Sequence, residues 1–90
     1  MALAIGFSPK TMTATQYEEC LRRLDAAGFG SPDGRREHLC YGTPDELRVV
    51  DVWESQEAAE AFGEHLRPVL EEVGITDPPQ MYEAHAFVSG

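Results

Sequence analysis

Residues 48–62 read RVVDVWESQEAAEAF and decide the fold, because they predict a strand that runs directly into a helix. Side chains of a strand alternate between its two faces. Val50 and Val52 therefore share one face, and Asp51 and Trp53 share the other. Helices on one side of a sheet cover only one of these faces. We expect the helices to cover the valines, and a second copy of the chain to cover the face with the carboxylate and the indole.

The helix that follows is predicted to begin after a single connector, Ser55, which is a good N-cap residue with Glu57 in the first turn. Its apolar stripe has helical spacing and comprises Ala58, Ala59, Phe62, Leu66, Val69, Leu70 and Val73. Pro68 falls inside the stripe and lacks a backbone N–H. We therefore expect a kink or break near Leu66, with a shorter helix restarting at Pro68.

Upstream of this segment, the chain predicts one strand and one helix. Residues 2–7, ALAIGF, are a short strand with Leu3, Ile5 and Phe7 on one face. Thr13 and Gln16 have the spacing of a capping box, so a helix is expected from Thr13 towards the stop signal at Gly28. Its apolar stripe comprises Tyr17, Cys20, Leu21 and Leu24. The loop 30–34 consists of turn-forming residues.

Two further strands complete the predicted sheet. Residues 36–41 form one strand, and the tight reversal at 42–45 joins it to the strand 47–53 as a hairpin. After the stiff linker at Asp77, Pro78 and Pro79, residues 81–88 form the last strand.

The element order is therefore β-α-β-β-α-β. Right-handed crossovers place both helices on one side of a four-stranded antiparallel sheet, which is the ferredoxin-like α+β arrangement. We expect residues 1–90 to form one such domain. The face turned away from the helices is predicted to carry His38, Cys40, Asp51, Trp53, Glu83, His85 and Phe87. Two such faces would enclose a shared barrel-like interior in a homodimer, burying roughly 1,200–2,000 Å².

Composition excludes several classes of partner. The formal net charge of −9 disfavours nucleic acid and anionic membrane surfaces, which attract Lys and Arg. The two cysteines and the lack of a signal peptide or membrane segment indicate a cytoplasmic protein. No zinc-ligand spacing, phosphate-binding glycine loop or nucleophile elbow is present, so we expect no metal site.

The chain resembles the dimeric α/β-barrel superfamily, and within it the small antibiotic biosynthesis monooxygenase-type domains. The resemblance covers nearly the whole chain and rests on the element order, on Val52-Trp53-Glu54-Ser55 with Phe62, and on the closing strand MYEAHAFV. It implies a homodimer and a cavity for a small aromatic or polyketide-like molecule. Superfamily members include cofactor-free oxygenases, haem-degrading enzymes, decarboxylases and cyclases. In the haem-degrading branch, a Trp matched by Trp53 and a His near His65 act with a first-strand Asn, but ALAIGF contains no Asn. We therefore expect no cofactor, with haem binding through His65 as a minor alternative.

Six residues are candidates for a site. An imidazole in a partly buried cavity can act as acid or base near neutral pH, so His38 and His85 are the predicted acid–base pair if both line one cavity. Asp51 is either a catalytic base or half of an interface ion pair. The predicted substrate-binding residues are Trp53, Phe87 and Cys40.

Each candidate also has a structural interpretation, because an aromatic ring or a histidine is often buried without function. The leading hypothesis is a cofactor-independent monooxygenase or isomerase. The alternative is a non-catalytic dimerisation or small-molecule-binding domain.

Overall fold

The computed structural model describes residues 2–86 of the chain. It contains two helices and four strands in the predicted order. In chain order these are β1 (Leu3–Phe7), α1 (Ala14–Ala26), β2 (Arg35–Thr43), β3 (Glu46–Trp53), α2 (Gln56–Glu72) and β4 (Gln80–Glu83).

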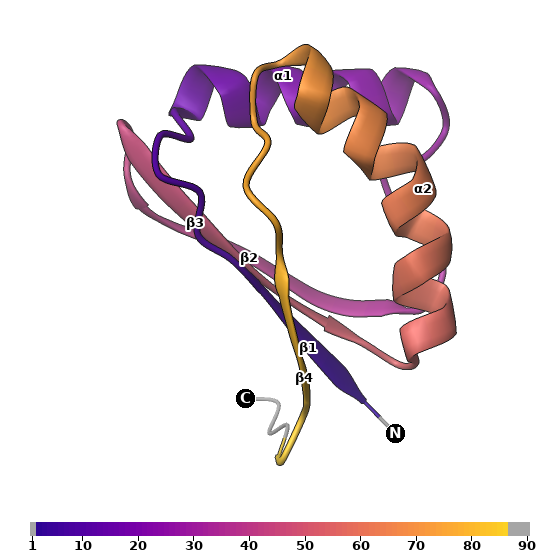
Figure 1. Cartoon of the computed structure of the whole chain (residues 1–90). Helices are drawn as coiled ribbons and strands as arrows, with labels where there is room; N and C mark the ends of the chain where they lie inside the picture. The colour runs from indigo at the N-terminus through magenta and orange to yellow at the C-terminus, as the bar shows by residue number, and fades with distance from the viewer. Residues whose placement is uncertain (1, 87–90) are drawn as a thin grey trace.

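The strands form one antiparallel sheet in the order β2-β3-β1-β4, and both helices lie on the same side of it (Figure 1). The two central strands pair Leu3 with Trp53 and Ile5 with Asp51. On the other side of β3, His38 of β2 is the partner of Asp51. This arrangement confirms the ferredoxin-like α+β fold.

The helix starts are those predicted from the sequence. Thr13 caps α1 with a complete capping box, because its hydroxyl accepts from the Gln16 N–H while the Gln16 side chain accepts from the Thr13 N–H. Ser55 caps α2 by accepting from the Ala58 N–H at 3.1 Å. The Gln16 amide also donates to the Val73 carbonyl at 2.9 Å, which ties the start of α1 to the end of α2.

The predicted break near Leu66 is wrong, since α2 continues through Pro68 as one helix. Pro68 and Glu64, the residue four positions earlier whose carbonyl loses its helical partner, are both exposed, so water can bond to this carbonyl. Leu66 and Val69, on either side of Pro68, pack against the core. This packing holds the helix together across the missing hydrogen bond.

The last strand is shorter than the predicted range 81–88. β4 follows its partner β1 only as far as the pair Leu3–Glu83, and one further hydrogen bond joins the Ala84 N–H to the Ala2 carbonyl. Beyond that point β1 offers no further residues for pairing. Residues 87 and 88 lie outside the described part of the chain.

The core lies between the sheet and the helices, and it reverses the predicted assignment of the faces. Trp53 is 1% exposed and packs with Leu24 of α1 and Phe62 of α2. Asp51 is 9% exposed on the same face, so the helices cover the face of β3 with the carboxylate and the indole. The alternation predicted from the sequence is confirmed, but its direction is wrong.

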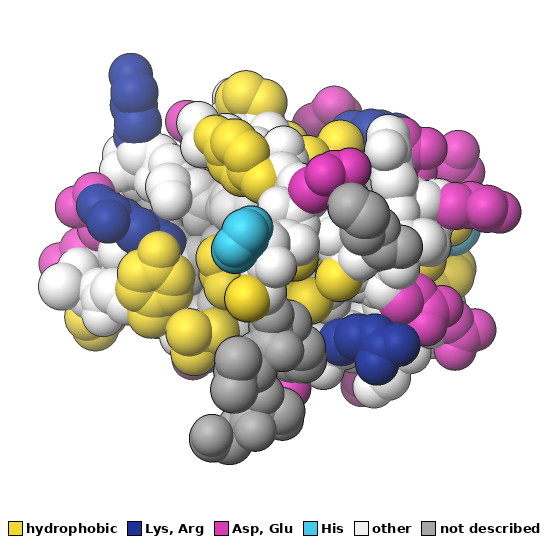
Figure 2. All heavy atoms as spheres, turned by 90° about the horizontal axis from the view of Figure 1, so that it is seen from below, with side chains coloured by type: hydrophobic (Ala, Val, Ile, Leu, Met, Phe, Trp, Pro, Cys, Tyr) yellow, Lys and Arg dark blue, Asp and Glu magenta, His cyan; other side chains and the backbone are white. Residues whose placement is uncertain are grey.

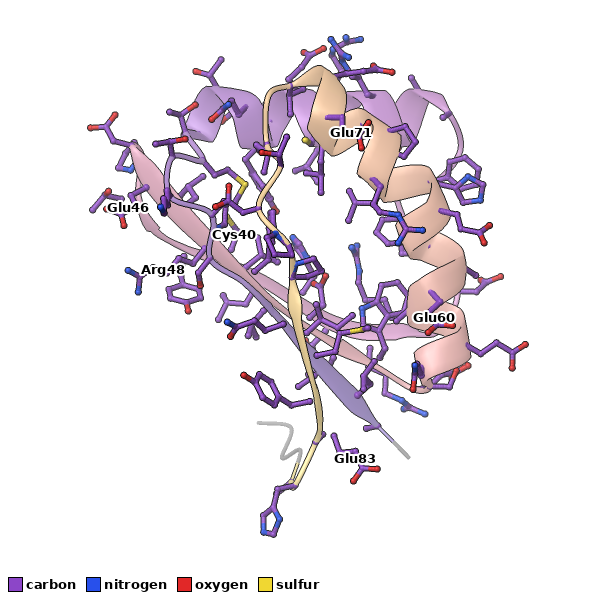
Figure 3. All side chains as sticks on the ribbon, viewed as in Figure 1. Cys40, Glu46, Arg48, Glu60, Glu71 and Glu83 are labelled. Atoms are coloured by element: carbon purple, nitrogen blue, oxygen red, sulfur yellow. The ribbon has the colours of Figure 1, made fainter. Side chains whose placement is uncertain are left out.

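Val50 and Val52 consequently lie on the outer face of the sheet, away from the helices. Val50 is 37% exposed, and its partner Leu39 on β2 is 57% exposed. Tyr41 and Tyr82 are exposed as well. Figure 2 shows hydrophobic side chains gathered over this face, and Figure 3 shows Arg48 on the outer side of the sheet and Cys40 on the helix side.

Candidate functional site

A cavity of about 480 Å³ lies between the sheet and the two helices. Protein sites for small molecules typically measure roughly 300–1,000 Å³. The connector from α2 to β4 crosses the front of this space in Figure 1, and residues 76–79 form part of the cavity wall. Most of the wall is apolar. Its side chains come from β1, the loop before α1, β3 and both helices, and include Ile5, Phe7, Met12, Leu24, Trp53, Phe62 and Leu70.

A chain of two hydrogen bonds joins three polar side chains of the cavity wall. The hydroxyl of Tyr17, on α1, lies 2.6 Å from Nε2 of His38 on β2. On the other side of the ring, Nδ1 of His38 contacts Oδ1 of Asp51 on β3. Three elements therefore meet at one imidazole, and all three residues line the cavity.

The order of donors and acceptors follows from the chemistry of the three groups. The Asp51 carboxylate only accepts, so Nδ1 of His38 carries a proton and donates to it. In a neutral imidazole Nε2 is then an acceptor, and the Tyr17 hydroxyl donates to it. Both ring nitrogens are thus occupied, and Asp51 fixes the tautomer and orientation of the ring.

Burial controls the acidity of the phenol and of the thiols around it. It is the largest cause raising the pKa of Tyr17 from 10.0 to about 12; the neighbouring Cys40 and Asp51 act in the same direction, whereas Arg35 opposes them. Burial also raises the pKa of the Cys40 and Cys20 thiols. Tyr17 is therefore a neutral phenol at physiological pH, and neither thiol is activated as a nucleophile.

The aromatic end of the cavity contains a cationic side chain, Arg35, and one buried donor without a partner, Nε1 of Trp53. Trp53 and Phe62 pack with ring centroids 5.4 Å apart, and the Arg35 guanidinium carbon lies 5.8 Å from the centre of the Phe62 ring. The indole Nε1 of Trp53 is buried and has no hydrogen-bond partner among residues 2–86. A buried donor without a partner is unusual and suits a ligand oxygen.

A second hollow, of about 470 Å³, lies outside this cavity at the loop after α1 and the first turns of α2. His65 is exposed there and stacks on Phe29 with ring centroids 3.8 Å apart. This hollow is more open to solvent. It also lacks a hydrogen-bonded pair of titratable groups among its described residues. We therefore place the candidate site in the cavity between sheet and helices.

The structure brings together three of the six predicted site residues. His38, Asp51 and Trp53 all line the cavity. Cys40 packs beside it, against the apolar cluster of Met12, Val49 and Ile75. His85 is exposed beyond the end of β4 and is not part of the cavity wall, whereas Phe87 lies outside the described residues.

Sequence reasoning missed Tyr17 and Arg35. The apolar stripe predicted for α1 includes Tyr17, and Arg35 falls one residue before the predicted start of its strand. The available signal was the hydroxyl of Tyr17, which needs a partner when an apolar stripe is buried. That requirement identifies the need for a polar partner but not which one.

No group of three His, Cys, Asp or Glu side chains within residues 2–86 is placed to hold a metal ion. His65 lies in the outer hollow and is not part of the wall of the cavity that contains Trp53. In the same range of residues, neither helix combines the length and hydrophobicity needed to cross a membrane.

Comparison with known proteins identifies the fold through structure rather than sequence. No protein-family model matches the chain, and no curated protein matches it in sequence. SnoaB, a cofactor-independent oxygenase from Streptomyces nogalater, superposes with a TM-score of 0.70 at 13% identity, over 99% of this chain and 98% of that one.

Two candidate antibiotic biosynthesis monooxygenases are similar in the same way. The protein from Chloroflexus aurantiacus has a TM-score of 0.65 at 12% identity, with 99% of this chain and 98% of that one covered. The protein from Deinococcus radiodurans has a TM-score of 0.63 at 18% identity, with 99% and 97% covered. The chain thus has the fold of the antibiotic biosynthesis monooxygenase proteins.

Proposed function

We propose that the protein is a cofactor-independent monooxygenase or isomerase acting on a small aromatic or polyketide-like molecule. The observation that carries this proposal is the largely apolar cavity of about 480 Å³ with the hydrogen-bonded His38 and Asp51 in its wall. The structural similarity to SnoaB, described as a cofactor-independent oxygenase, supports the reaction class.

The chemistry needs a base and a place to hold an electron-rich ring. In the proposed oxygenation His38 is the base that finally holds the proton lost by the substrate, and the Asp51 carboxylate stabilises the resulting imidazolium. The substrate anion then reduces O₂, and oxidation of a ring CH₂ to a carbonyl releases water. Trp53 serves as a wall against the ring, and Cys40 packs behind another part of the wall, against Met12 and Val49.

His85 does not belong to the proposed acid–base group, since it is exposed and lies past the end of β4. Phe87 stays a prediction for the substrate-binding wall.

We further propose that the protein is a homodimer formed through the outer face of its sheet. Leu39, Val50, Tyr41 and Tyr82 are exposed on this face, as the register of the strands requires. Exposed apolar patches of this kind are typical of protein interfaces. Covering such a patch adds stability to a small domain.

A cytoplasmic location remains part of the proposal. Cys20 and Cys40 are both unpaired. Free thiols are typical of a reducing compartment.

The second candidate is a non-catalytic domain that binds a small molecule and dimerises. The engagement of both ring nitrogens of His38 favours this candidate, because a fully bonded imidazole can be a structural element. In that case the cavity would still bind a ligand without converting it.

Oxidation of dithranol, an electron-rich trihydroxyanthracene, tests the proposal. Oxygen uptake and formation of the oxidised ketone are followed with wild-type protein, and heat-denatured protein measures the background rate. We expect His38→Ala to abolish the catalysed rate and His65→Ala, an exposed histidine outside the cavity, to leave it unchanged. A rate equal to background in the wild type, with the ligand still bound, would favour the binding domain.

A further inference from the structure

We propose that Tyr17 is a catalytic residue that receives a proton from an acidic hydroxyl group of the substrate and passes its own proton to His38. The cavity would accordingly select phenols and enols. This inference rests on the proposed function for the location of the site and adds the group that the substrate contacts.

In the proton relay from Tyr17 through His38 to Asp51, Tyr17 is the end that faces the cavity and can contact a ligand. Asp51 occupies Nδ1 of His38, and the Tyr17 hydroxyl occupies Nε2 at 2.6 Å. A ligand therefore finds no free nitrogen on the imidazole. The phenol oxygen that caps the ring donates its single proton to His38, and its lone pairs remain available to accept a hydrogen bond from a ligand.

The proton transfer balances, and Tyr17 stays neutral throughout. The O–H bond of the substrate breaks as an O–H bond forms to Tyr17, while the original O–H bond of Tyr17 breaks as an N–H bond forms at Nε2 of His38. The products are a substrate oxyanion, a neutral phenol and an imidazolium paired with the Asp51 carboxylate. No external oxidant or reductant takes part in this step. A Tyr17 pKa of about 12 agrees with this role, since the phenol relays the proton and is never left ionised.

The charged groups around the relay suit an anion formed in place. Asp51 and Cys40 face Tyr17 from the sheet, and Arg35 at the other end of β2 supplies positive charge that reaches Tyr17. Arg67, Glu71 and Asp77 also border the cavity, from α2 and the connector after it. Arg35 forms no ion pair within residues 2–86, and Nε1 of Trp53 is a buried donor without a partner there. These two donors can stabilise an oxyanion that appears only after proton transfer.

The proton-accepting relay and the two donors for an oxyanion together restrict the chemical class of ligand that the cavity can bind. A carboxylic acid is already ionised at neutral pH and has no proton to give. An ordinary alcohol is too weak an acid to protonate an imidazole. Phenols and enols lie between these limits, and their flat rings match the apolar walls formed by Phe7, Trp53 and Phe62.

The test uses para-nitrophenol, whose anion is yellow and which has no oxidation chemistry to complicate the readout. Trp53 is the single tryptophan of the chain, so quenching of its fluorescence reports binding independently. The experiment is run at the pKa of the free probe. We expect wild-type binding to raise the ratio of anion to neutral probe roughly tenfold, as for a pKa lowered by one unit. Nitrogen NMR of His38 should show the imidazolium at the same time.

Two variants separate the relay from packing. Tyr17→Phe keeps the ring, and His38→Gln keeps hydrogen-bonding capacity without the base. Both should quench Trp53 on binding yet leave the probe ratio unchanged. His65→Gln, at an exposed histidine outside the cavity, makes the same change as His38→Gln and should behave as wild type.

Each other outcome has a distinct meaning. Ionisation of the probe in Tyr17→Phe as in wild type would overturn the role of Tyr17. A wild-type protein that neither binds nor ionises the probe would overturn the hydroxyl site, even if dithranol is oxidised. Ionisation of the probe without oxidation of dithranol would keep the relay and overturn the monooxygenase proposal.

Discussion

The two faces of β3 belong to one strand and meet opposite environments. On the inner face Trp53 and Asp51 are almost fully covered by the helices, and the carboxylate is bonded to His38. On the outer face Val50 remains 37% exposed although it is wholly apolar. The more polar face is therefore the more deeply buried one.

The comparison shows that partners, rather than polarity, decide which face is buried. Asp51 is tolerated inside because β2 supplies an imidazole and α1 supplies a hydroxyl that completes the chain. Outside, Val50 and Leu39 need no hydrogen bonds, and a second apolar surface is enough to cover them. The inner face thus forms a cavity with chemistry, and the outer face offers an interface.

The largest loss of stability is expected from removing the Trp53 ring from the inner face of β3. Trp53→Ala removes the ring that contacts both helices, and we expect the free energy of unfolding to fall by about 3–5 kcal/mol. Urea denaturation followed by circular dichroism measures the change. Leu21→Ala is the control, since Leu21 is exposed on α1 and should cost far less. Equal losses in the two variants would contradict the assignment of the inner face.

Placing a charge on the outer face tests its role as an interface. Leu39→Glu should weaken the proposed homodimer by roughly 3 kcal/mol, about a hundredfold in Kd, because the carboxylate would be buried without a partner. Analytical ultracentrifugation measures the association. Leu21→Glu places the same charge on an exposed helical position and should leave the association intact. A wild-type monomer at all concentrations would end the proposal.

Removing the charge of Asp51 tests why a carboxylate is tolerated inside. Asp51→Asn keeps the shape but leaves an amide donor without an acceptor, so we expect a loss of about 1–3 kcal/mol in unfolding free energy. Glu46→Gln, on an exposed site of the same strand, is the matched control. If both changes were neutral in urea denaturation, the hydrogen-bond chain would not be what holds Asp51 inside.

The smallest effect concerns alkaline pH. The folded-state pKa of Tyr17 is raised from 10.0 to about 12, so the folded protein holds this proton more tightly than the unfolded chain. Its contribution to stability is complete below pH 10 and is lost as the pH rises towards 12. Spectrophotometric titration should show one tyrosine fewer ionising near pH 12 in Tyr17→Phe than in wild type. A difference near pH 10 instead would mean that Tyr17 is not desolvated.

Local features of the fold were predictable because their signals lie within a few residues. The capping box at Thr13, the cap at Ser55 and the hairpin before β3 are confirmed, since each depends on neighbouring side chains and backbone. The predicted break near Leu66, with a restart at Pro68, was wrong because the packing of α2 on the core outweighs the local effect of the proline.

The candidate site was predictable only in part. His38, Asp51 and Trp53 were recognised as sharing a face, because a strand alternates with a period of two and antiparallel partners stay on one side. Tyr17 was missed because its contact with His38 spans 21 residues of sequence and crosses from a helix to a strand. His85 was given a place on the same sheet, but the strand ends before it because β1 runs out of partners.

The sequence by itself determined the order of elements, the ends of the helices and the grouping of side chains by face. Each of these follows from the period of a helix or strand and from caps that act within one turn. Only the tertiary structure decided which face the helices cover. That choice depends on the contact of Tyr17 with His38 and on the packing of Leu24 and Phe62 against Trp53. These residues lie far apart in the chain, and the periodicity of a helix or strand does not predict contacts between them.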